Sequence, residues 1–130
     1  MMTELPSSCD YLTAAEASAA LGIAVTAKSD TLLPTACVYE NDKSAEVGYL
    51  TVEQSATVSK TLDGLVAYPP PGTTFELVPG VGDKAALAGP PEGRALVVAG
   101  AFGFDYTRGG AGSPASVDQL KAILQALVTP

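Results

Sequence analysis

At residues 9–16 the chain reads Cys9-Asp10-Tyr11-Leu12-Thr13-Ala14-Ala15-Glu16, with a cysteine shortly before the predicted start of a helix. The second and last cysteine, Cys37, lies in the strand-like run Ala36-Cys37-Val38-Tyr39-Glu40. An even number of cysteines, each next to ordered structure, indicates a disulfide bond and therefore an oxidising compartment. We predict that Cys9 and Cys37 form this bond and tie the entry of the first helix to a strand.

The predicted bond would close a loop of about 29 residues and stabilise the fold by roughly 3.5 kcal/mol, a sizeable share of a small domain's stability. The alternative is two unrelated buried thiols in a cytosolic protein, because free cysteine packs as a small hydrophobe. A metal site is disfavoured, since the sequence has no histidine and two thiolates fall short of the usual ligand set of zinc. We expect no bound metal and no cofactor.

Chain length and net charge limit the number of domains and the kinds of partner that fit the sequence. The chain has 130 residues, an ordinary size for one domain, and carries 14 acidic against 7 basic side chains, which gives a net charge of −7. The acidic residues are scattered singly, a pattern typical of a solvated surface. Such a surface repels phosphate backbones and anionic lipids. We therefore expect no nucleic-acid partner, and membrane association only through a lipid anchor that this chain lacks.

The N-terminal residues bear on where the domain begins. Met1 to Leu5 lack the basic start and apolar stretch of a signal peptide, and no run in the sequence is long and apolar enough to cross a bilayer. If the disulfide forms, a secretion signal is expected to have been removed, whereas a genuine intracellular start would count against the bond. We predict that residues 1–8 are disordered or left over from expression, and that residues 9–130 form a single domain.

Periodicity and turn residues predict the helices and strands. Thr13 and Glu16 match a capping box, and Gly22 supplies the left-handed end of the helix that they begin. Ser116 and Gln119 repeat the capping pattern before a C-terminal helix with an apolar stripe. The predicted helices are 14–21, 55–67 and from 116 onward, and the predicted strands are 23–27, 36–40, 45–53, 73–78, 84–88 and 94–107.

These elements follow one another in the order α-β-β-β-α-β-β-β-α. Strands grouped between helices in this way predict an α+β domain, with an antiparallel sheet and helices packed mainly on one of its faces. The last strand, 94–107, is expected to carry Leu96, Val98 and Phe104 on one face and Asp105 on the other.

Several motifs together resemble a domain of unknown function that is found in secreted lipoproteins of actinobacteria, in mycobacterial and streptomycete envelopes. They are Cys9 before the helix start Leu12-Thr13-x-x-Glu16, the helix end Leu21-Gly22, the segment Cys37-Val38-Tyr39, the run Val78-Pro79-Gly80-Val81-Gly82-Asp83-Lys84-Ala85, and the amphipathic C-terminal helix. In that family the domain follows a lipid-modified cysteine and a linker. The resemblance therefore implies a place outside the membrane, and it implies no catalytic residue.

Few residues suit catalysis. Without histidine, and with both thiols in a disulfide, the Ser-His-Asp and Cys-His arrangements are excluded. A serine nucleophile with a lysine as its base remains formally possible. Ser59 and Lys60 are neighbours in the sequence, however, so their side chains would point apart on a helix. Glu40 with Asp42 or Glu46 could act in sugar hydrolysis or bind calcium, but a position beside a turn favours solvation. We predict no catalytic residue.

Two loops have both a structural and a functional interpretation. Gly80-Val81-Gly82-Asp83 lacks the ending of a P-loop and the third glycine of a dinucleotide site, so a tight turn explains it better. Pro69-Pro70-Pro71-Gly72 ends a helix and favours an extended connector. The sharper alternative is an exposed docking segment flanked by Tyr68 and Phe75.

Two classes of function fit the sequence. The first is an extracytoplasmic, noncatalytic binding module of a cell-envelope lipoprotein, whose partner is an envelope protein or a small apolar ligand. For this class we expect exposed aromatic side chains at Tyr68, Phe75 and Tyr106, with Arg108 as a polar anchor, because aromatic and arginine side chains concentrate interface energy. The second is a small secreted hydrolase or accessory enzyme with a carboxylate-based site. The missing histidine and the dispersed acids favour the first.

Overall fold

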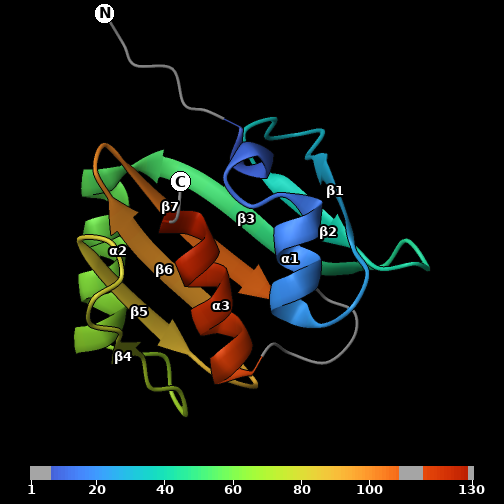
Figure 1. The fold of residues 1–130 in the computed structure, drawn as a ribbon. Coiled ribbons are helices and arrows are strands. Elements are labelled where there is room, and N and C mark those ends of the chain that lie inside the picture. Colours follow the sequence, from blue (N-terminus) through green and yellow to red (C-terminus); the bar gives the residue numbers. More distant parts are fainter. Residues whose placement is uncertain (1–6, 109–115, 129–130) are drawn as a thin grey trace, which may run out of the picture.

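The computed structural model describes residues 7–108 and 116–128, which form one antiparallel sheet with helices on both faces (Figure 1). The sheet has seven strands in the order β1-β2-β3-β7-β6-β5-β4. The elements in chain order are η1 (Ser8–Asp10), α1 (Ala14–Leu21), β1 (Thr26–Ser29), β2 (Cys37–Glu40), β3 (Glu46–Gln54), α2 (Ser55–Ala67), β4 (Glu76–Leu77), β5 (Lys84–Ala88), β6 (Arg94–Ala99), β7 (Phe102–Arg108) and α3 (Val117–Val128).

The predicted α+β class and antiparallel sheet are confirmed. Helices α1 and α2 and strand β5 have the predicted bounds, β2 begins one residue later than predicted, and β3 is shifted by one residue at both ends. Strand β1 begins later than predicted, at Thr26, and β4 is only two residues long. The two edge strands are therefore the elements that the sequence placed least well.

The prediction of one strand over 94–107 is wrong. A turn at Gly100 and Ala101 divides this run into β6 and β7, which pair with Ala99 opposite Phe102. Gly100 has a φ of +65°, a left-handed conformation that glycine adopts without strain. Leaving η1 aside, the order of elements is therefore α-β-β-β-α-β-β-β-β-α.

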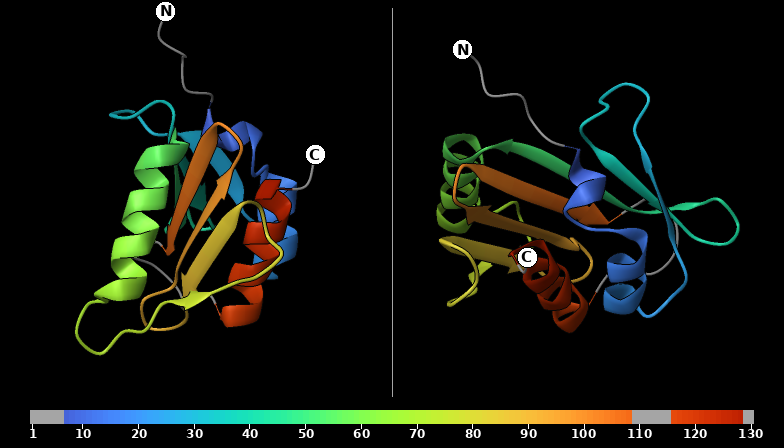
Figure 2. Two further views of the ribbon diagram at one scale, coloured as in Figure 1. Left: turned by 90° about the vertical axis from the view of Figure 1, so that its left-hand side faces the viewer. Right: turned by 45° about the horizontal axis from the view of Figure 1, so that its top comes forward.

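Two of the described α-helices cover one face of the sheet, in line with the expectation of helices mainly on one face, and the third covers the other face. Helices α1 and α3 lie side by side on one face, and α2 lies on the opposite face (Figure 2). The core under α1 and α3 includes Leu50, Phe104 and Tyr106, whereas the core under α2 is built around Val58 and Leu62. The cause is visible in β5, where residues 85–88 are all buried, because a strand that is apolar on both faces needs cover on both.

The helix ends form as the sequence predicts. The Thr13 hydroxyl accepts a hydrogen bond from the Glu16 amide at 3.2 Å, and the Glu16 carboxylate accepts one from the Thr13 amide at 2.9 Å. Gly22 ends α1 with a φ of +72°. Ser116 and Gln119 form the same reciprocal pair before α3, at 2.8 and 3.2 Å. These caps satisfy amide groups that a helix leaves unpaired at its start.

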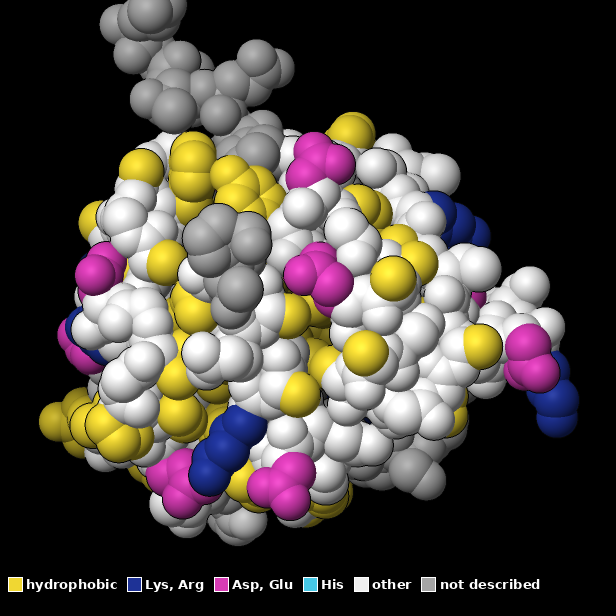
Figure 3. Space-filling view, viewed as in Figure 1, with side chains coloured by type: hydrophobic (Ala, Val, Ile, Leu, Met, Phe, Trp, Pro, Cys, Tyr) yellow, Lys and Arg dark blue, Asp and Glu magenta, His cyan; other side chains and the backbone are white. Residues whose placement is uncertain are grey.

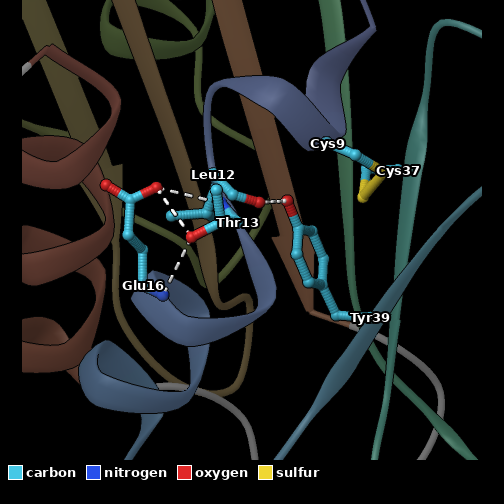
Figure 4. Close-up of a disulfide and its surroundings, with 6 residues drawn as sticks. All are labelled: Cys9, Leu12, Thr13, Glu16, Cys37 and Tyr39. Carbon is cyan, nitrogen blue, oxygen red and sulfur yellow. Dashed lines mark hydrogen bonds between the residues drawn. A yellow bond between two sulfur atoms is a disulfide. The ribbon is translucent and has the colours of Figure 1, made fainter. Parts of the chain in front are cut away.

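The predicted disulfide is present and joins η1 to β2 (Figure 4). The sulfur atoms of Cys9 and Cys37 are 2.06 Å apart, and their Cα atoms are 5.1 Å apart. A second link lies beside it, where the buried Tyr39 hydroxyl donates to the Leu12 carbonyl at 2.6 Å. The segment that leads into α1 is thus held to β2 by a covalent bond and by a hydrogen bond.

The folded part of the chain includes a residue that was predicted to precede the domain. Ser8 begins η1 and is fully buried, and its amide donates to the Thr35 carbonyl at 2.7 Å. Ser7 precedes η1 as its N-cap, and residues 1–6 of the predicted disordered segment lie outside the described residues. Within the ranges 7–108 and 116–128, no helix has the length and apolar character needed to cross a membrane.

Candidate functional site

Helix α2 covers only part of its face of the sheet. It packs on β5, β6 and the first half of β7, and a Cβ atom added at Gly103 would overlap the side chain of Val58. Strands β1 and β2, with the second half of β7 and much of β3, extend beyond α2 on the same side (Figure 2). This side therefore keeps an area that no described helix covers.

The pairing of the strands shows which side chains occupy that area. Val38 lies opposite Tyr49, Tyr49 opposite Thr107, and Thr107 opposite Arg94. Directly opposed residues point to the same face of a sheet, and Leu96, two residues after Arg94, belongs to the core under α2. This set therefore faces the same side as α2. We call it the open face, and it consists of Val38, Tyr49, Thr51, Arg94, Asp105 and Thr107.

An ion pair lies on the side of the open face formed by β6 and β7. The Arg94 guanidinium donates two hydrogen bonds to the Asp105 carboxylate, from Nε at 3.0 Å and from Nη2 at 2.6 Å. Their side chains are 24% and 19% exposed, so solvent reaches both. The hydrogen bonds to Asp105 raise the pKa of Arg94. The paired charges cancel, while guanidinium N–H groups beyond the two used remain available as donors.

The side of the open face that is nearer to β1 is acidic. The Tyr49 hydroxyl donates to the Asp30 carboxylate at 2.7 Å. This bond, with burial and the charges of Asp30 and Glu46, raises the pKa of Tyr49 to about 12. Glu40 pairs with Lys28 at 3.1 Å. Three acidic side chains thus stand here against one basic side chain, which favours a partner with positive charge.

Two hollows lie away from the open face. One, of about 220 Å³, is formed by the loop between β4 and β5, residues 77–85. The other, of about 290 Å³, lies between α1 and α3 and is lined by Glu16, Ala19, Ala20, Ala122 and Ala126. Figure 3 shows the α1 and α3 side, where hydrophobic side chains form small groups among polar atoms. The first hollow is below the usual size of a small-molecule pocket, and the second is at its lower limit.

The residues predicted to form a binding surface do not come together. Tyr68 is 86% exposed, as expected. The expectation of exposure is wrong for Phe75, which is buried in the core under α2, and for Tyr106, which is buried under α1 and α3. Arg108 is half-buried, and its Nε donates to the Pro91 carbonyl at 2.7 Å. Because Phe75 and Tyr106 belong to cores on opposite faces of the sheet, the four residues cannot form one surface.

The open face was missed because the sequence was interpreted with one long strand in place of β6 and β7. A hairpin with a two-residue turn pairs even-numbered with odd-numbered positions, so Leu96 lies opposite Asp105. Asp105 therefore shares a face with Leu96, and Phe104 does not. The available signal was Gly100, a turn residue inside an unusually long predicted strand.

The acidic residues that were considered for catalysis are ion-paired or exposed to solvent. Glu40 is ion-paired with Lys28, and Asp42 and Glu46 are exposed. In the described ranges, no group of three or more histidine, cysteine or acidic residues lies close enough together to hold a metal ion. Asp83 has the structural role expected of a turn residue, since its carboxylate accepts a hydrogen bond from the Gly100 amide at 2.9 Å.

Comparison of the sequence with models of known protein families gives no match. A comparison with curated proteins likewise gives no match. The resemblance to an actinobacterial lipoprotein domain therefore stays a prediction.

Proposed function

We propose that this chain is an extracytoplasmic, noncatalytic binding module that docks a protein partner on its open face. The observation that carries the proposal is the part of the α2 side left without a helix. Most of its side chains are half-buried rather than packed in a core, and its ion pair is reachable by solvent. An extended, mixed polar and apolar surface of this kind resembles the composition of protein–protein interfaces.

The shape of the molecule favours a protein over a small apolar ligand. Small apolar ligands are usually held in concave pockets of about 300–1,000 Å³ that enclose most of their surface. The open face contains the Arg94–Asp105 pair and the hydroxyls of Thr51 and Thr107, which suit hydrogen bonds across an interface. An apolar ligand would remove the contact of these groups with water and supply no hydrogen bond in return, at a cost in free energy.

The disulfide supports the proposed location. A Cys9–Cys37 bond persists in an oxidising compartment and is rare where thioredoxin and glutathione keep thiols reduced. The lipoprotein assignment rests on the motif resemblance, and the actinobacterial source rests on it as well. In that setting a lipid anchor ahead of the domain would hold the module at the envelope.

The carboxylate-based enzyme is not proposed, because the acids considered for it are placed as solvated or ion-paired side chains. Glu40 is engaged by Lys28, and Asp42 lies exposed in the turn between β2 and β3. Asp105 is held by two hydrogen bonds from Arg94. The hydrogen bonds from Arg94 occupy the oxygens that this carboxylate would need for a substrate.

Photo-crosslinking from single positions tests the partner. The photoreactive residue p-benzoylphenylalanine would replace Thr107 on the open face, or Lys121 on the exposed surface of α3 as the matched control. After irradiation of living cells of the source organism, we expect one discrete protein adduct from position 107 and none from position 121. Equal adduct patterns at the two positions, or no protein adduct at position 107, would contradict the proposal.

Thiol trapping tests the location. Cells are treated with a membrane-permeant alkylating reagent before lysis, and the protein is then denatured and its free thiols are counted by mass spectrometry. We expect neither Cys9 nor Cys37 to be alkylated unless a reductant is added first. Two alkylated cysteines in untreated cells would place the chain in a reducing compartment.

A further inference from the structure

The loop between β1 and β2 displays two adjacent leucines. In the described part of the chain five large hydrophobic side chains are exposed, and Leu32 and Leu33 are neighbours, 92% and 42% exposed. We call residues 31–35 the leucine loop. Single exposed leucines are common on soluble domains, so exposure alone says little. The informative feature is how the loop is held.

The leucine loop is fixed at its base. The Asp30 amide donates to the Ala36 carbonyl at 3.1 Å, and the Ala36 amide donates to the Leu33 carbonyl at 2.8 Å. The Thr35 carbonyl accepts from Ser8 at 2.7 Å, and Cys37, just beyond the loop, carries the disulfide. A loop with this many constraints holds its apolar tip in place before binding, which lowers the entropy cost of an interface.

The leucine loop borders the open face. Asp30, at its start, accepts the hydrogen bond from Tyr49, which is a member of the open face. Figure 2 shows the loop projecting to the same side of the sheet as α2. Two apolar side chains therefore stand beside a polar surface, which is the arrangement of an anchor next to a rim of hydrogen-bonding groups.

We infer that the leucine loop is the anchor of the proposed interface, and that it inserts into an apolar pocket of a protein partner whose surrounding surface is basic. This inference rests on the proposed function. The positive charge follows from Asp30, Glu40 and Glu46 around Tyr49, opposed there by Lys28 alone, and from the net charge of −7. The pocket follows from the two leucines, whose side chains the described residues leave 92% and 42% exposed.

Other occupants fit less well. A bilayer would gain little from two leucines, since even a single myristoyl chain gives only marginal membrane binding, and anionic lipid repels this chain. A second copy would bring two acidic surfaces together, which opposes association. A protein with complementary charge has neither disadvantage.

Photo-crosslinking from the loop itself tests the anchor. The photoreactive residue p-benzoylphenylalanine replaces Leu33, and the adduct is compared by mass spectrometry with that from position 107. In a second set of variants, position 107 carries the photoreactive residue and Leu32 is changed to Ser, with Leu32→Met as the matched control. A further control, Leu77→Ser, changes an exposed leucine in β4 and so tests for the effect of a general loss of apolar surface. Leu32 is almost fully exposed, so these changes leave the fold intact, and thermal melting verifies this.

We expect the same protein adduct from positions 33 and 107. Leu32→Ser should lower the yield from position 107 by about tenfold or more, as for an interface hot spot, while Leu32→Met and Leu77→Ser leave it within about twofold. A lipid adduct or no adduct from position 33, or a yield unchanged by Leu32→Ser, overturns the anchor while the adduct from position 107 still supports the open face. Loss of the adduct from position 107 in the otherwise unchanged chain overturns both.

Discussion

Tyr39 and Tyr106 are both fully buried on the α1 and α3 side of the sheet, and their hydroxyls have different surroundings. Tyr39 donates to the Leu12 carbonyl at 2.6 Å, in the turn that leads into α1. Among the residues that the structure describes, the Tyr106 hydroxyl has no hydrogen-bond partner, and it lies against Gly48, where an added Cβ would overlap the ring. One hydroxyl therefore fixes an element, and the other is a buried polar group at a cost.

Removing each hydroxyl should have different effects on stability. Tyr39→Phe leaves the Leu12 carbonyl buried without its donor, so we expect the free energy of unfolding to fall by about 1–3 kcal/mol. Tyr106→Phe removes an unpaired group of the same shape, so stability should stay level or rise by up to about 1 kcal/mol. Guanidinium denaturation at neutral pH measures both. Equal losses in the two variants would show that Tyr106 has a partner in solution.

Exposure of single side chains was the level at which the sequence predicted least. Phe75 and Tyr106 were expected at the surface because aromatic side chains concentrate interface energy. Phe75 comes just before β4 and packs under α2, and Tyr106 alternates with Asp105 on a strand whose two faces differ. Burial of such residues depends on which helix covers which face, and no local pattern encodes that.

At the scale of elements, local signals predicted the helices well, because α1 and α3 begin with capping pairs and α2 has an apolar helical period that ends before Pro69. Thr13, Glu16 and Gly22 act within one or two turns of chain, so their effect does not depend on the rest of the fold. The hairpin of β6 and β7 was missed because its turn has a single glycine inside an apolar run. Without stronger turn residues, a hairpin and a long strand look alike in sequence.

Gly103 and Gly64 allow the effects of side-chain packing and of helix propensity on stability to be measured separately. Gly103 on β7 lies under Val58 of α2, where a Cβ would overlap a stiff β-branched side chain. We expect Gly103→Ala to destabilise the protein by about 1–3 kcal/mol. Gly64, inside α2, has open space around it, so Gly64→Ala should stabilise by about 0.5–1 kcal/mol through helix propensity.

Chemical denaturation of the two variants measures this pair, and the double variant Gly103→Ala, Val58→Ala provides the control. Shortening Val58 removes the overlap, so the double variant should lose less stability than the two single changes together. If Gly103→Ala proved neutral by itself, α2 would not pack on β7 as closely as described.

The disulfide joins η1 to β2 and should carry a measurable part of the stability. The sequence separation of 28 residues between Cys9 and Cys37 gives a closed loop whose entropy loss in the unfolded chain corresponds to about 3.5 kcal/mol. We expect reduction to lower the free energy of unfolding by about this amount. Denaturation with and without a phosphine reductant measures it. The variant Cys9→Ala, Cys37→Ala should match the reduced protein and ignore the reductant.

At the scale of the whole molecule, the fold class and the antiparallel sheet could be predicted from the sequence. The distribution of the helices over the two faces of the sheet could not. The open face exists because α2 covers only part of its side, which depends on the position of β7 between β3 and β6. In that strand order, β3 from the first half of the chain pairs with β7 from the second half, so the order is fixed by long-range pairing. Composition and periodicity describe segments one at a time, so they gave the segments without this arrangement.

Alkaline pH should unfold the whole molecule through its buried tyrosines. Burial raises the pKa of Tyr106 to about 12, and burial together with the neighbouring Tyr106 raises the pKa of Tyr39 further. An unfolded tyrosine has a pKa near about 10, so above that pH the unfolded state loses protons before the folded state does. The stability that these groups contribute is therefore complete below about pH 10 and is lost as pH rises beyond it.

We expect the free energy of unfolding to be unaffected by these two groups up to about pH 9 and to fall by about 3 kcal/mol by about pH 11, roughly half from each tyrosine. Denaturant titrations across this range measure the slope. Tyr106→Phe should reduce the slope, and Tyr39→Phe, Tyr106→Phe should reduce it further, leaving the smaller part that comes from Tyr49, whose pKa is also raised. An equally steep slope in the double variant would show that other groups drive the alkaline transition, and the two hydroxyls would then be solvated in the folded protein.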